Sequence, residues 1–198
     1  MNRRTVLASV NALLVAGCVA DDGTGGSTRE SETSTDLDIE TRLKRMNEIP
    51  YDLIHVARTN DIPAWAEGVG RPAGTAELFA SSAATLERIP FEHVEPSQEE
   101  AVRAFVEETD FDRARLLYVV VVGLGNAELR VGVDRLGIHD DELVGSVTAQ
   151  NAEEGDSIDT YASAIVRATV DDRSPPAKAT IHVDAIHDRE TVVEATVD

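Results

Sequence analysis

The second half of the chain carries the clearest hydrophobic pattern, in which six short apolar runs are separated by turn-forming residues. The run at 116–122 (LLYVVVV) is unbroken and rich in β-branched side chains, which is typical of a central strand buried on both faces. Further runs predict strands at 129–133, 143–149, 161–170, 179–185 and 191–197. These strands favour a mainly β fold of the α+β class, an antiparallel sandwich or meander of about six to eight short strands.

The first half of the chain mixes extended and helical patterns. Residues 51–58 (YDLIHVAR) and 76–80 predict strands, and residues 60–71 carry the Pro and Gly of a loop. Ser81 or Ser82 is expected to cap a short helix that ends at Ile89. Ser97 and Glu100 form a capping box ahead of a helix at about 98–108. We therefore expect one globular domain over 40–198, with its one or two short helices within 40–112 and the strand-rich part at 113–198.

Residues 1–17 have the pattern of a signal peptide. Arg3 and Arg4 give a positive start, an apolar core of about 12–14 residues follows, and this core is too short to span a membrane. The Val-Ala-Gly-Cys sequence at 15–18 resembles the lipobox of secreted lipoproteins. That resemblance implies cleavage between Gly17 and Cys18 and a lipid on the Cys18 sulfur. The alternative is an ordinary free or buried cysteine.

The start of the chain also bears on export and location. Arg3 and Arg4, followed by Thr-Val-Leu, resemble a twin-arginine export signal, with the general secretory route as the alternative. Residues 18–39 are rich in Asp, Gly, Ser and Thr and are expected to form a flexible, lipid-anchored tether. The expected location is therefore the extracytoplasmic face of the cell membrane, which the chain contacts through the lipid on Cys18.

The charge balance is strongly acidic, with 37 acidic against 18 basic side chains and a net charge of −19. This balance argues against nucleic acid as a partner, because nucleic acid requires a concentrated positive face. The acids are dispersed along the domain, and Lys44 and Lys178 are the only lysines beside many arginines. This composition resembles that of halophilic proteins, in which molar salt screens the repulsion between carboxylates. The alternative is an acidic face that binds cations or a basic partner.

Several short motifs resemble a known β domain. They are SSAATLE at 81–87, Thr-Asp-Phe at 109–111, the strand at 116–122 and the turn at 123–129. Over about 75–197 they are similar to the C-terminal domain of a bacterial lipoprotein that stabilises a secreted protease complex, a family with haloarchaeal lipoprotein relatives of unknown function. The resemblance implies a non-catalytic, partner-binding domain. The chain departs from the family at Asn126, Ala127 and Glu128, which puts a ligand site at that turn in doubt.

The sequence lacks the familiar signatures of catalysis and cofactor binding. Gly-Leu-Gly at 123–125 begins like a dinucleotide fingerprint, but Glu128 stands where the third glycine belongs and an alternating segment follows, so a tight hairpin turn is favoured. The chain has no P-loop, no Gly-x-Ser-x-Gly elbow and no His-Glu-x-x-His. We expect no cofactor and assign no catalytic residue.

Two groups of residues carry metal-capable side chains. In HVDAIHD at 182–188, His182 and Asp184 would project from one strand face, with His187 in the turn beyond. The alternative there is an exposed polar strand face. His-Asp-Asp-Glu at 139–142 could supply carboxylate oxygens to Ca²⁺, although adjacent acids arise readily by chance in this chain.

Trp65 is the only tryptophan and lies in the loop at 60–71, where it is a candidate ligand contact or a plug over the end of the sandwich. His55 and His93 have no partner that the sequence identifies. Three hypotheses follow. The first is a lipid-anchored binding or accessory module, for which a protein at the cell surface is one partner. The second is a surface hydrolase that uses carboxylates or a metal at His182, Asp184 and His187, and the third is a structural envelope protein.

Overall fold

The computed structural model describes residues 32–69, 72–124, 128–151, 158–171, 173–186 and 189–197. The signal peptide with Arg3, Arg4 and Gly17, the lipidation site Cys18 and the first part of the tether lie outside the described residues. His187 also lies outside them. No helix in the described part of the chain combines the length and the apolar character that a membrane span requires.

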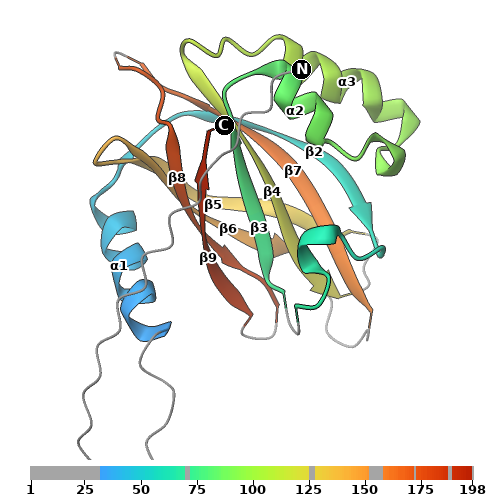
Figure 1. The fold of residues 1–198 in the computed structure, drawn as a ribbon, viewed down its shortest axis with the longest axis horizontal. Helices are drawn as coiled ribbons and strands as arrows, with labels where there is room; N and C mark the ends of the chain where they lie inside the picture. The colour runs from blue at the N-terminus through green and yellow to red at the C-terminus, as the bar shows by residue number, and fades with distance from the viewer. Residues whose placement is uncertain are drawn as a thin grey trace, which may run out of the picture.

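The described strands form two sheets, and the fold is mainly β as the sequence predicts (Figure 1). One sheet has five strands in the order β1-β5-β6-β8-β9, and the other has four in the order β2-β7-β4-β3. The strands of the five-stranded sheet are β1 (Asn47–Glu48), β5 (Arg130–His139), β6 (Glu142–Gln150), β8 (Lys178–Asp184) and β9 (Glu190–Thr196). Those of the four-stranded sheet are β2 (Tyr51–Thr59), β7 (Asp159–Thr169), β4 (Ala114–Leu124) and β3 (Gly74–Phe79).

Strand pairing is antiparallel throughout both sheets except between β6 and β8, which run parallel. The exception arises because the chain crosses to the other sheet as β7 between these two strands. The tight hairpin turn expected at 123–125 is wrong for a similar reason. Strand β4 continues to Leu124 in the four-stranded sheet, and β5 lies in the five-stranded one, so the connection joins two sheets.

Strand β4 is buried on both faces, which confirms the interpretation of its unbroken apolar run. Leu117, Val119 and Val121 belong to the core between the two sheets. Leu116, Tyr118, Val120 and Val122 belong to a second core on the opposite face. The four-stranded sheet is therefore the middle layer of the molecule.

The outer face of the four-stranded sheet is covered by α2 (Ser82–Arg88), α3 (Pro96–Glu107) and two short 3-10 helices, η1 (Ala64–Ala66) and η2 (Phe91–His93). Ser81 caps α2 as predicted, because its Oγ accepts a hydrogen bond from the Ala84 N–H at 3.3 Å. The capping box expected at Ser97 is wrong. Helix α3 begins two residues before the expected start, at Pro96, whose fixed φ suits the first helical position, so Ser97 already lies inside the helix.

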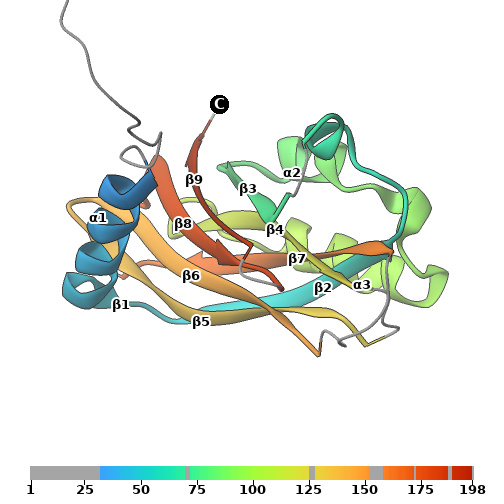
Figure 2. The same cartoon turned by 90° about the horizontal axis from the view of Figure 1, so that it is seen from below.

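Helix α1 (Glu32–Arg45) shows that the expected tether at 18–39 is too long at its C-terminal end. Ile39 is only 2% exposed and belongs with Met46 and Val144 to a third core, against which Leu43 packs. Ile39, Leu43 and Met46 follow the i, i+4, i+7 spacing of one helix face, which outweighs the polar composition around them. Helix α1 lies on the opposite side of the molecule from α2 and α3 (Figure 1 and Figure 2).

Candidate ligand-binding site

The cover over the four-stranded sheet is incomplete beside Trp65, where a cavity of about 220 Å³ opens. We call it the Trp65 cavity. Its floor comes from β4, β7 and β2, and its walls come from residues 61–65 and from residues 88–93, which run from the end of α2 through η2. The residues that line it are Ala57, Thr59, Asp61, Ile62, Pro63, Ala64, Trp65, Arg88, Pro90, Glu92, His93, Tyr118, Val120, Tyr161 and Ser163.

Aromatic side chains form the apolar part of the Trp65 cavity. The rings of Trp65 and Tyr161 meet edge to face, with centroids 6.0 Å apart and an angle of 84° between their planes. Tyr118 is 7% exposed and Tyr161 is 4% exposed, so both rings are held by the surrounding sheet. Ile62 lines the same cavity and is 64% exposed. Rigid rings beside an exposed apolar side chain are typical of a small-molecule site.

The polar groups of the Trp65 cavity are hydrogen-bonding groups rather than activated nucleophiles. Burial raises the pKa of Tyr118, and hydrogen bonding to Ser163 opposes this shift only in part, so the phenol stays neutral at ordinary pH. The Ser163 hydroxyl donates to the Ala57 carbonyl and accepts from the Ala57 N–H, both at 3.2 Å. A serine held in this way lacks the free geometry of a nucleophile.

Charged groups at the rim of the Trp65 cavity are largely paired. The Arg88 guanidinium donates from Nε to both carboxylate oxygens of Glu77, at 2.7 and 2.8 Å. His93 Nε2 lies 3.9 Å from the exposed carboxylate of Asp61. The groups that this cavity offers to a ligand are therefore rings and neutral hydrogen-bonding groups more than free charges.

A second, more polar cavity of about 320 Å³ adjoins the first one. We call it the His55 cavity. Ala57, His93 and Ser163 line both cavities, so the two spaces share a wall. The residues that line the His55 cavity are His55, Val56, Ala57, Arg58, His93, Glu95, Gln98, Leu129, Arg130, Ala162 and Ser163.

A β-bulge in β2 arranges the His55 cavity. His55 pairs with Ala164, and Arg58 pairs with Ala162. His55 and Arg58 are three residues apart, whereas their partners are two residues apart, because the register shifts between His55 and Ala57. Ala162 and Ala164 both face the core between the sheets. The extra residue, Val56, thus places His55 and Arg58 on one face of the strand, which a regular strand could not do.

Positive charge gathers in the His55 cavity. Burial lowers the pKa of His55, and the charge of Arg130 lowers it further. Arg58 and Arg130 form no ion pair with any described residue, although most other arginines do. Among the described residues, Glu95 is the one acidic side chain that lines this cavity.

The candidate metal site on β8 is not assembled by the described residues. Thr180 packs beneath α1, which places it and the alternate residues His182 and Asp184 on the outer face of the five-stranded sheet. His182 Nε2 lies 3.2 Å from a Glu190 oxygen, and neither His182 nor Asp184 lines a cavity described above. No three His, Cys, Asp or Glu side chains are grouped to hold a metal within the part of the chain that the structure describes.

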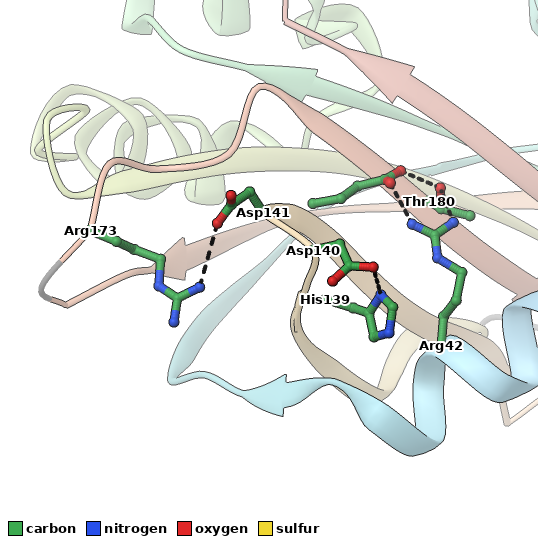
Figure 3. Close-up of polar contacts among 7 residues, drawn as sticks. Arg42, His139, Asp140, Asp141, Arg173 and Thr180 are labelled. Carbon is green, nitrogen blue, oxygen red and sulfur yellow. Dashed lines mark hydrogen bonds and ion pairs between the residues drawn. The ribbon is translucent and has the colours of Figure 1, made fainter.

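The acidic residues at 139–142 point toward separate partners rather than toward one ion (Figure 3). Asp141 lies 3.9 Å from Arg173, and Asp140 lies 3.3 Å from His139 Nδ1 without hydrogen-bond geometry. Glu142 pairs with Arg42, whose Nη1 also donates to Thr180 at 3.1 Å. The separation follows from the turn, since Asp140 and Asp141 form a two-residue loop between β5 and β6.

Comparison with known proteins adds no identification, because no protein-family model, no curated protein and no solved structure matches this chain. The candidate site therefore depends on its own geometry. The sequence singles out Trp65, and the structure places it in a cavity. It does not reveal Tyr118, Tyr161, Arg58 or Arg130 as neighbours of this site. Their meeting depends on strand order and on the bulge, and no local sequence pattern encodes either.

Proposed function

We propose that this chain is a lipid-anchored, extracytoplasmic binding module that takes a small ligand into the Trp65 cavity. The observation that carries the proposal is the perpendicular pair of Trp65 and Tyr161 beside the buried phenol of Tyr118. Together these groups offer two ring surfaces and one neutral hydroxyl to a ligand. They supply recognition without supplying a reactive group.

Anchoring is proposed from the sequence at the start of the chain. The positive pair Arg3 and Arg4, the short apolar core and the small residues before Cys18 fit export followed by lipid attachment. A lipid with two chains would hold the module stably, whereas one chain binds a membrane only marginally. The binding module would then act at the outer surface of the cell.

Ligand binding is tested by the fluorescence of Trp65, because this residue is the only tryptophan and the signal reports on the cavity alone. Monocyclic aryl alcohols and monosaccharides are titrated into the mature protein in molar KCl. A saturable change in emission supports the proposal. Tyr118→Phe should weaken binding of a hydroxyl-bearing ligand about fivefold to tenfold, the effect of one lost hydrogen bond. Tyr51→Phe removes an exposed phenol outside the cavity and serves as the control. Linear, non-saturable responses to every compound would reject the cavity as a binding site.

Anchoring has a separate test. Cys18→Ser should release the protein into the medium or leave the precursor uncleaved, as immunoblots of membrane and medium fractions would show. A Cys18→Ser protein that is still cleaved and still membrane-bound would contradict the lipid anchor.

A further inference from the structure

The His55 cavity concentrates positive side chains in a chain whose net charge is −19. Arg58 and Arg130 line it without an ion-pair partner among the described residues, and His55 and His93 line it with them. In such an acidic chain, exposed guanidinium groups would be expected to find carboxylates. Two that do not, in one cavity, indicate a place for an anion from outside the chain.

The geometry of β2 makes this arrangement a built feature. A regular strand would send His55 and Arg58 to opposite faces, whereas the bulge at Val56 sends both toward Arg130 at the start of β5. The residues that pair with them, Ala164 and Ala162, are small and leave room above the strand. Bulges of this kind commonly redirect side chains at functional sites.

The chemistry of the cavity matches an oxyanion. Guanidinium groups present a planar fork of N–H donors that fits carboxylate, sulfate or phosphate oxygens. His55 adds an imidazole whose pKa is lowered by burial and by Arg130, as happens where positive charge lacks a compensating anion. An anion bound there would raise that pKa.

We propose that the His55 cavity binds an oxyanion, the sulfate, phosphate or carboxylate group of a small acid. His55 and Arg58 pair with Ala164 and Ala162, which face the core between the sheets, so the two side chains lie on the opposite face of the four-stranded sheet from the Trp65 cavity. The anion site therefore rests on the His55 cavity alone and is independent of the proposed function. The volume of the His55 cavity, about 320 Å³, lies within the range of about 300–1,000 Å³ that small-molecule sites occupy.

The test uses three probes on the mature protein in 1 M KCl. Benzenesulfonate carries a ring and an oxyanion, sulfate carries the oxyanion alone, and benzyl alcohol carries the ring alone. None of them changes charge between about pH 5 and pH 9, so pH acts only on the protein. Trp65 fluorescence reports binding in the Trp65 cavity, and the imidazole resonances of His55 and His93 report binding in the His55 cavity. Sulfate and benzenesulfonate should both raise the pKa of His55, and benzyl alcohol should leave it unchanged.

The decisive variant is the pair Arg58→Gln and Arg130→Gln, matched by Arg45→Gln. Arg45 is an exposed arginine that forms no ion pair with any described residue and lines neither cavity. The paired variant should weaken sulfate binding, followed by the His55 resonance, about tenfold or more and leave the Trp65 response to benzyl alcohol unchanged, while Arg45→Gln should change neither. Circular dichroism of the pair checks that it folds.

Each outcome separates the two proposals. If neither sulfate nor benzenesulfonate shifts the His55 resonance, or if the paired variant binds both anions as the wild type does, the anion site is rejected, whatever the Trp65 response to benzyl alcohol. If no ring compound changes Trp65 emission but sulfate still raises the pKa of His55, the anion site stands and the proposed function fails. A sulfate effect that survives the paired variant would mean nonspecific binding and would overturn the inference.

Discussion

Tyr161 meets Trp65 edge to face across the Trp65 cavity, with the ring planes 84° apart. Tyr161 comes from β7 in the middle layer of the molecule and Trp65 comes from η1, so the contact between the two rings packs η1 against the four-stranded sheet. Tyr161→Leu should lower the free energy of unfolding by about 0.5–1.5 kcal/mol beyond the loss of buried area and shift Trp65 emission to the red. Tyr161→Phe should retain both properties. Urea unfolding followed by fluorescence and circular dichroism measures the effect. A Leu variant with wild-type emission would show that the pair does not position Trp65.

The loop between β5 and β6 predicts a stabilising substitution. Asp140 and Asp141 have φ values of 49° and 62°, the left-handed region in which Asn and Gly are favoured at two-residue hairpin turns. Asp140→Asn with Asp141→Gly should raise the free energy of unfolding by about 1 kcal/mol. The ion pair of Asp141 with Arg173 is too exposed to offset this gain. Thermal unfolding with 5 mM CaCl₂ or with chelator provides the comparison. Stabilisation of the wild type by Ca²⁺, absent in the variant, would restore the calcium hypothesis for 139–142.

The features of this fold that the sequence predicts are those encoded by residues close together in the chain. The strands of the second half, the burial of β4 on both faces and the Ser81 cap follow from patterns within a few residues of the chain, and each is confirmed. The hairpin after β4 is wrong because two strands joined by a short connection pair only if they share a sheet. Hydrophobic alternation does not say which sheet a strand joins. The sequence does not predict the start of α1 for a different reason, since the few apolar residues of this helix are spread along a polar segment.

The candidate site was less predictable than the fold. Trp65 could be noticed because it is the only tryptophan in an aromatic-poor chain. His55 had no identifiable partner in the sequence, and its neighbour Arg130 lies in the other sheet. The bulge that places Arg58 on the same face as His55 is a departure from the period of two by which strands are read from sequence. His182 and Asp184, in contrast, indicate a metal site only through their proximity in the sequence, and the described residues bring them no third ligand.

Salt dependence should follow from the net charge of −19. Charges repel over about 10 Å at 0.1 M salt and over about 3 Å at 1 M, so we expect the melting temperature to fall as KCl is reduced below 1 M. Glu100, Glu107 and Glu108 are exposed on or beside α3 and form no ion pair with described residues. Replacing all three with Gln should stabilise the protein at 0.1 M KCl, because it reduces the net negative charge and removes two carboxylates, Glu107 and Glu108, that oppose the helix dipole at the end of α3. At 3 M KCl the substitutions should have little effect on stability, because salt screens both interactions. Equal effects at both salt concentrations would contradict a screened, long-range origin.

Tyr118 should make the protein sensitive to alkali. Burial raises the pKa of this phenol above its ordinary value of 10.0. Between that value and the folded-state pKa, the unfolded chain loses the proton that the folded chain keeps, so the folded state binds more protons and the free energy of unfolding falls as pH rises. Tyr118→Phe removes this contribution and should flatten the decline of melting temperature above pH 10, even if it lowers stability at pH 8 through the lost hydrogen bond with Ser163. Parallel curves for Tyr118→Phe and wild type would show that the phenol ionises as readily in the cavity as in water, and the cavity would then be wetter than its lining indicates.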